Sequence, residues 1–73
     1  MIEVRLFATF RENRKKIDFI NSEKFSNVID IINYYGIDAN EVAICLINGF
    51  HSKLDDNVKD GDVIALFPPV GGG

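Results

Sequence analysis

The sequence predicts an α+β domain in which a mixed sheet of four to five strands packs on one helix, in the order β-β-α-β-β-β. Three observations lead to this prediction. Apolar and polar residues alternate along residues 1–10, as in a half-buried strand. Apolar residues recur at helical spacing within residues 28–35. The run Val63–Phe67 is apolar at every position, which suits a strand in the centre of a sheet.

The N-terminal alternation predicts one strand over residues 1–10, and its inward face is Ile2, Val4, Leu6, Ala8 and Phe10. Phe7 is an aromatic residue on the otherwise polar opposite face. A charged connection with turn-prone Asn13 leads to a second short strand that ends at Ile20, so residues 1–20 predict a hairpin. We interpret the cationic cluster in this connection as a solvated turn rather than a binding patch; it comprises Arg11, Arg14, Lys15 and Lys16.

Helix signals follow the hairpin. Ser26 is a candidate N-cap, and the apolar face after it comprises Val28, Ile31, Ile32 and Tyr35. Gly36 suits the left-handed position that ends a helix. Ile37 is then placed to contact Ile32, as in a Schellman motif.

The second half of the chain predicts three more strands. Asp38–Glu41 is expected to be a surface loop, and Val42–Ile47 a strand buried on both faces. Asn48-Gly49 is a strong hairpin signal, so Phe50–Leu54 should return as a short strand. Asp60-Gly61-Asp62 predicts a tight turn before the last strand.

A single helix must cover one face of this sheet, and the last strand should lie centrally beside the first. This arrangement is the β-grasp, or ubiquitin-like, architecture. The last strand stops at Pro68 and Pro69, since proline has no N–H for a sheet ladder. Glycines then run to the end of the sequence and predict a thin, mobile arm. We therefore expect a β-grasp domain over 1–67 and a flexible glycine-rich tail over 68–73.

Composition narrows the function. With 73 residues and a net charge of −3, the chain predicts one small domain and argues against nucleic-acid binding. Cys45 is the only cysteine, so an intrachain disulfide is excluded and a buried core position is favoured. The chain also has a single histidine, and structural zinc sites need four Cys or His ligands, so a structural metal is not expected. The absence of a membrane-length apolar stretch and of a signal-peptide pattern predicts a cytoplasmic protein without membrane contact.

Several motifs carry a family resemblance. They are Ile2–Ala8, Phe10-Arg11-Glu12, Ile47-Asn48-Gly49, Leu54-Asp55, Lys59–Val63, Phe67-Pro68-Pro69-Val70 and Gly72-Gly73. In these segments the chain resembles the MoaD/ThiS sulfur-carrier family, and within it the small subunit of molybdopterin synthase. The resemblance covers most of the chain in outline and is specific in the last third.

The resemblance implies a reaction carried out largely by partners. A ubiquitin-activating-type adenylyltransferase (MoeB/ThiF-like) uses ATP to convert the carboxylate of Gly73 to an acyl-adenylate. A sulfur donor then replaces the adenylate and leaves a thiocarboxylate. The tail enters a larger molybdopterin synthase subunit (MoaE-like), which receives the sulfur for a pterin precursor. The chain itself then needs no bound cofactor and no catalytic constellation of its own, and acts as the sulfur-carrying subunit.

The resemblance also assigns roles to residues. Gly73 would carry the thiocarboxylate, and the tail that partners bind would be Pro68, Pro69, Val70, Gly71 and Gly72. Phe7 and Phe67 match a partner-docking patch on the helix-free face of the sheet, which agrees with the position of Phe7 in the alternation. The alternative is that both rings pack in a shallow cluster with their neighbours. His51, just after the hairpin turn, is placed at the edge of this docking face.

One departure from the family is Gly71, where many MoaD-like tails carry another residue. It leaves two alternatives open: a thiamine-type sulfur carrier, and a ubiquitin-like modifier joined to target amines through the same glycine. Phe67-Pro68-Pro69 favours the molybdopterin branch, without distinguishing molybdenum from tungsten.

Overall fold

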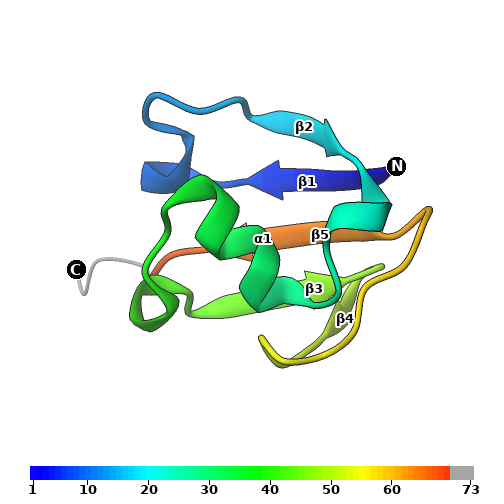
Figure 1. The fold of residues 1–73 in the computed structure, drawn as a ribbon. Coiled ribbons are helices and arrows are strands. Elements are labelled where there is room, and N and C mark those ends of the chain that lie inside the picture. The colour runs from blue at the N-terminus through cyan, green and yellow to red at the C-terminus, as the bar shows by residue number, and fades with distance from the viewer. Residues whose placement is uncertain (70–73) are drawn as a thin grey trace.

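The computed structural model describes residues 1–69, in which one α-helix lies across one face of a five-stranded mixed sheet (Figure 1). The strand order across the sheet is β2-β1-β5-β3-β4. In chain order the elements are β1 (Ile2–Leu6), β2 (Ile17–Ile20), α1 (Val28–Tyr35), β3 (Ile44–Ile47), β4 (Phe50–His51) and β5 (Val63–Phe67). Three short 3-10 helices connect them: η1 (Ala8–Arg11), η2 (Ser22–Lys24) and η3 (Ala39–Glu41). The β-grasp fold and the predicted element order are confirmed.

The last strand, β5, occupies the centre of the sheet as predicted. It pairs in parallel with β1 and antiparallel with β3, with Leu6 opposite Leu66 and Ile44 opposite Phe67. A strand with neighbours on both sides has its backbone groups in ladders. The side chains of β5 on the helix side are fully buried, and those on the opposite face are half-buried. The β5 boundaries, Val63 and Phe67, are those that the sequence predicts.

The core fills the space between α1 and the sheet. Alternate residues of β1 and β5 point toward the helix, and α1 contributes the apolar face that its spacing predicted. The fully buried side chains are Ile2, Val4, Leu6, Val28, Ile31, Ile32, Ile64 and Leu66. Cys45 is also buried, as predicted, at 5% exposure. No helix within residues 1–69 has the length and apolarity that a membrane crossing requires.

The end of α1 follows the sequence, but its start does not. Gly36 adopts φ 72°, and the N–H of Ile37 donates to the carbonyl of Ile32 at 2.9 Å, which confirms the Schellman motif. The N-cap is Asn27 rather than Ser26: its side chain accepts from the N–H of Asp30 at 3.0 Å. Asparagine and serine cap equally well, so local preference could not separate them.

The first strand was predicted too long. β1 ends at Leu6, and Ala8 adopts φ 54°, which starts η1. This turn brings Phe10 back into the core at 3% exposure and leaves Ala8 exposed, so Ala8 is not on the inward face. Local alternation cannot detect such a turn, because Phe10 is inward in both arrangements.

Two strands of the second hairpin are also shorter than predicted. β3 begins at Ile44, which is 37% exposed, so the strand is not buried on both faces. The Asn48-Gly49 turn forms as predicted, with positive φ at both residues. After His51 the chain leaves the sheet and pairs with the start of α1. The carbonyl of Leu54 accepts from the N–H of Ile29, and the carbonyl of Asp56 accepts from the N–H of Val28. Helix amides in the first turn have no partner within the helix, so a tertiary acceptor stabilises them.

Asp62 links the β3–β4 turn to the start of β5. Its carboxylate is 3% exposed and accepts from Asn48 Nδ2 at 3.0 Å and from the N–H of Lys59 at 2.9 Å. Asn48 Oδ1 accepts in turn from the N–H of Val63 at 2.9 Å. Burial opposes ionisation of Asp62, but the hydrogen bonds from Asn48 and Lys59 outweigh it and hold the pKa of this carboxyl below its usual range. The Asp-Gly-Asp turn is therefore a structural network.

Candidate functional site

The strongest candidate site lies where β5 ends and the tail begins. Phe67 stacks on Phe7 with ring centroids 4.2 Å apart and an interplanar angle of 14°. The sheet brings the two rings together. β1 and β5 are parallel neighbours with Leu6 opposite Leu66, so the residues that follow, Phe7 and Phe67, lie side by side. The structure thus brings together the two aromatic residues that the sequence assigned to a docking face.

Hydrogen bonds on both sides hold the end of β5. The N–H of Phe7 donates to the carbonyl of Leu66 at 3.2 Å, and the N–H of Ala43 donates to the carbonyl of Phe67 at 2.9 Å. β5 stops at Phe67, followed by half-buried Pro68 and exposed Pro69. The predicted tail residues Val70, Gly71, Gly72 and Gly73 lie outside the described residues, so their predicted role and mobility stay predictions.

Arg11 extends this pair and was not assigned to the site from the sequence. Its guanidinium carbon lies 5.1 Å from the centroid of the Phe7 ring, and its Nε donates to the carbonyl of Leu6 at 2.7 Å. A guanidinium over an aromatic face is stabilised by the ring quadrupole. The η1 turn creates the contact by folding residue 11 back toward residue 7. A strand over residues 1–10 would have carried Arg11 away from Phe7.

The stacked pair belongs to a larger apolar surface on the helix-free face, which we define as the sheet face opposite α1. Register places alternate residues of four strands on it, with Ile44 of β3 directly beside Phe67. The apolar members are Phe7, Ile17, Phe19, Ile44, Leu46, Val63, Ala65 and Phe67. Glu3 and Arg5 of β1 lie among them and form an ion pair at 2.5 Å. An apolar sheet face with a charged centre is suited to a protein interface.

His51 shares the helix-free face but lies apart from the aromatic pair. It is opposite Leu46, which is opposite Ala65, so β3 separates its strand from β5. Two strand spacings alone put His51 roughly 10 Å from the β5 axis. His51 is therefore at the edge of this face, where the sequence analysis placed it, and its role in docking stays a prediction.

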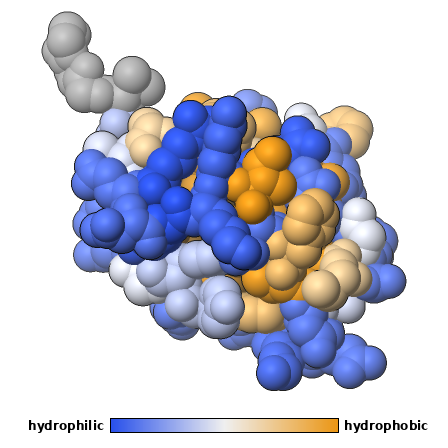
Figure 2. All heavy atoms as spheres, turned by 90° about the horizontal axis from the view of Figure 1, so that it is seen from above, coloured by the Kyte–Doolittle hydropathy of each residue, from blue (hydrophilic) through white to orange (hydrophobic). Residues whose placement is uncertain are grey.

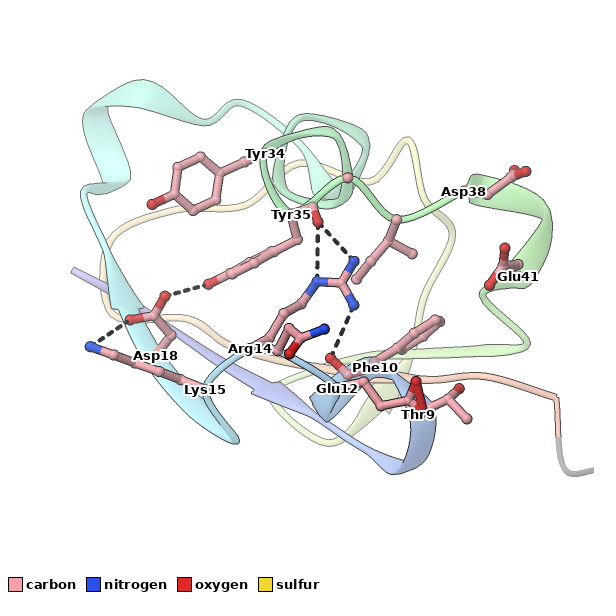
Figure 3. A pocket seen from close by; sticks show the side chains of 13 residues that line it. Thr9, Phe10, Glu12, Arg14, Lys15, Asp18, Tyr34, Tyr35, Asp38 and Glu41 are labelled. Atoms are coloured by element: carbon pink, nitrogen blue, oxygen red, sulfur yellow. Dashed lines mark hydrogen bonds and ion pairs between the residues drawn. The ribbon is translucent and has the colours of Figure 1, made fainter.

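A hollow of about 910 Å³ lies elsewhere, between η1, the following loop and the C-terminal end of α1 (Figure 3). Arg14 crosses it and donates to the carbonyls of Tyr35, at 3.1 and 3.0 Å, and Phe10, at 3.3 Å. Asp18 accepts from the hydroxyl of Tyr35 at 2.9 Å, and Lys15 lies 3.9 Å from it. Burial and Asp18 raise the pKa of Tyr35, which keeps its phenol a donor. The cationic cluster is thus divided: its two arginines bind carbonyls, while Lys15 and Lys16 are exposed.

Cys45 is the one thiol of the chain, and it is not placed to react. Burial, with a smaller contribution from the charge of Asp56, raises its pKa to about 11. A thiol with that pKa is almost entirely protonated at neutral pH, and the thiolate is the nucleophilic form. Cys45 serves as a small apolar side chain of the core.

Known proteins share both the sequence pattern and the fold. The model of the ThiS family matches residues 4–73, nearly the whole chain. Among solved structures, a Pyrococcus furiosus protein assigned as molybdopterin converting factor subunit 1 is 27% identical, with a TM-score of 0.72, 94% of this chain covered and 97% of that one. A second solved structure is a complex of subunits 1 and 2 of molybdopterin-converting factor from Helicobacter pylori. Its matching chain is 27% identical, with a TM-score of 0.61, and the match covers 99% of this chain and 97% of that one.

SAMP1 from Haloferax volcanii is 24% identical, with a TM-score of 0.73, 99% of this chain covered and 98% of that one; this likeness supports the fold alone. The family match is the stronger finding, since it covers the sheet, the helix and the glycine end together. The chain therefore belongs to the ThiS family, the MoaD/ThiS-like sulfur carriers with a ubiquitin-like fold.

Proposed function

We propose that this chain carries sulfur for molybdopterin synthesis as a thiocarboxylate on Gly73. The observation that carries the proposal is the Phe7–Phe67 stack, with ring centroids 4.2 Å apart, at the end of β5. It puts an aromatic anchor on the helix-free face at the residue from which the tail leaves. A partner that grips this face therefore holds the start of the tail at a defined point. The family match, which runs through Gly73, supports the same assignment.

The proposed chemistry takes place at the carboxylate of Gly73. The carboxylate attacks the α-phosphorus of ATP in the activating enzyme, and pyrophosphate leaves. The product is an acyl-adenylate, which has a far better leaving group than a carboxylate. With sulfide as the donor, attack of HS⁻ on the acyl carbon expels AMP and leaves the thiocarboxylate. The chain contributes the carrier group, and the partners contribute the acid–base residues.

Two observations favour the molybdopterin branch over thiamine synthesis. Phe67-Pro68-Pro69-Val70 resembles the tail of molybdopterin synthase small subunits. Two structural relatives at 27% identity are named for molybdopterin converting factor, one of them in a complex of subunits 1 and 2. By analogy with that complex, we propose that a larger subunit binds the helix-free face and takes up the tail. The activating partner would be an adenylyltransferase of the ubiquitin-activating type.

The test is the intact mass of the purified protein after incubation with ATP, sulfide and an activating enzyme from the same source. We expect one oxygen to be replaced by sulfur, and fragmentation to map the change to the peptide that ends at Gly73. An unchanged mass, with the same enzyme active on another carrier, would contradict the proposal. Isopeptide-linked conjugates in cells without any thiocarboxylate would favour the modifier alternative instead.

Replacing Phe67 by alanine is expected to weaken binding of the larger subunit. Truncating a central aromatic anchor typically costs about 2 kcal/mol or more, which is about thirtyfold in Kd. Phe7→Ala should have a similar effect, because either substitution removes the stacked pair. Isothermal titration calorimetry of each variant against the larger subunit measures the change.

Phe50→Ala is the matched control. Phe50 is the most exposed of the large apolar residues in the described part of the chain, at 75%, but it lies opposite Ile47 on the helix side of β4. Its removal should leave the Kd within about twofold. If Phe50→Ala weakened binding as much as Phe67→Ala, the interface would not be the helix-free face.

A further inference from the structure

β2 is an edge strand of the sheet, and its outer side has backbone N–H and C=O groups that can pair with another strand. β2 is antiparallel to β1, and the N–H of Leu6 donates to the carbonyl of Lys16 at 2.9 Å. In an antiparallel ladder, hydrogen-bonded residue pairs alternate with non-bonded pairs. The backbone N–H and C=O groups of Asp18 and Ile20 therefore also point toward β1. The amides and carbonyls of Ile17 and Phe19 therefore point away from the sheet. Such an edge is a template for an additional strand.

Apolar surface lies on both sides of this edge. On the helix-free face, Ile17 is 45% and Phe19 58% exposed. On the helix side, a hollow of about 420 Å³ runs between β2, η2 and α1, with Ile20, Phe25 and Tyr34 in its lining. Figure 2, which views the molecule from the side where β2 lies, shows apolar side chains gathered into one patch beside strongly hydrophilic ones. Side chains of an added strand alternate between its faces, so both sets would meet apolar surface.

The charge around the edge is positive in a chain that is negative overall. Residues 1–24 hold six of the eight Lys and Arg residues and four of the eleven Asp and Glu residues, so this segment has a net charge of +2 in a chain of −3. Lys15 and Lys16 are exposed just before β2, and Lys24 lines the hollow just after it. A ligand strand would therefore have a cation near each of its ends. Acidic side chains at those ends would complement them.

We propose that the β2 edge is a second docking site, which binds an extended peptide segment of another protein. The segment has alternating apolar residues in its centre and acidic residues at its ends. It pairs with the outward backbone groups of Ile17 and Phe19, as in recognition by strand addition. This site is separate from the tail, and it gives the carrier a way to hold a partner while Gly73 reacts.

Asp18 regulates access to this edge. Its Oδ1 accepts from the N–H of Phe19 at 3.0 Å, while its Oδ2 is held by the hydroxyl of Tyr35 at 2.9 Å. One of the outward amides is thus covered when no ligand is bound. A carbonyl of the incoming strand takes over the Phe19 amide, and Asp18 keeps its bond to Tyr35. The groups facing Asp18 are Lys15, from the loop before β2, and Tyr35 of α1, and neither loses its partner.

The experiment is an NMR titration of the isotope-labelled full chain with a synthetic peptide. The peptide is blocked at both ends and has a central Val-Ile-Val-Ile segment with glutamates on each side. We expect amide shifts at Ile17 and Phe19 and along η2, and slower hydrogen exchange of these two amides. A peptide with lysines in place of the glutamates should bind at least about tenfold more weakly. Lys24→Glu should weaken binding of the acidic peptide at least about fivefold.

Two further variants make the test specific. Asp18→Asn should strengthen binding about twofold or more, because it weakens the competing acceptor and removes a charge near the acidic peptide. Phe50→Ala, on the opposite edge strand β4, should leave the affinity unchanged. Shifts confined to Phe7 and Phe67, equal binding of both peptides, or no binding would overturn the proposal. Concentration-dependent shifts at Ile17 and Phe19 without peptide would also overturn it, since the edge would then bind a second copy of the chain.

Discussion

Adding one alanine after Gly73 is expected to abolish thiocarboxylate formation completely. The reacting group would then be the carboxylate of a residue with a Cβ, one residue beyond the position that the activating enzyme holds. Reacting atoms must lie within about 3–3.5 Å of each other in a productive complex, and an added residue moves the carboxylate by about 3.5 Å. The measurement is intact mass after incubation with ATP, sulfide and the activating enzyme.

The extended chain should keep its fold, because the added residue lies beyond the β-grasp domain of residues 1–67. A change in thermal midpoint would indicate that the variant had altered the domain. Replacement of Gly71 by alanine is the matched control within the tail, because it adds a Cβ there and leaves the carboxylate on Gly73. It should still be loaded. Full sulfur loading of the extended chain would contradict the prediction that the reacting carboxylate must belong to Gly73.

Replacing Asp62 by alanine should destabilise the domain more than any other single change of a carboxylate in the described residues. The side chain is 3% exposed, and its removal leaves Asn48 Nδ2 and the N–H of Lys59 without their acceptor. Hydrogen bonds to a charged group contribute about 1.5–3 kcal/mol each. Asn48 and Lys59 are themselves exposed, so water replaces part of each lost bond, and we expect a loss of about 2–3 kcal/mol. For a domain of this size that corresponds to a fall of roughly 10–20 °C in Tm.

The pH dependence of the same variant provides an independent check. The folded-state pKa of Asp62 is lowered, so its stabilising contribution is fully present above the unfolded-state pKa of about 3.9. The contribution is lost as the pH falls through that value toward the folded pKa. Urea unfolding should therefore show the difference between wild type and Asp62→Ala shrinking below about pH 4.

Exposed Asp55 provides the control for Asp62. Asp55→Ala changes a solvated surface carboxylate and should alter the unfolding free energy by less than about 0.5 kcal/mol. Should Asp62→Ala be as mild as Asp55→Ala, water or a rearranged turn would be satisfying Asn48 and Lys59. A difference between wild type and Asp62→Ala that grew on acidification would contradict the assignment of the lowered pKa to Asp62.

Local patterns in the sequence were sufficient to predict the order of strands, the helix and its end, and the central place of β5. Each depends on interactions within a few residues or on the apolarity of one segment. Gly36 ends α1 because it tolerates φ 72°, and Asn48-Gly49 turns because both residues tolerate positive φ. The prediction that Phe7 faces away from the core followed from alternation alone.

Contacts between distant segments decided the remaining features. β1 stops at Leu6 because Phe10 reaches the core through η1, and that turn places Arg11 over Phe7. Buried Asp62 is paired with Asn48, fourteen residues earlier, which donates to it. His51 lies apart from Phe67 because β3 pairs between their strands. Such positions depend on which segments meet in the folded chain, and local periodicity carries no information about those meetings.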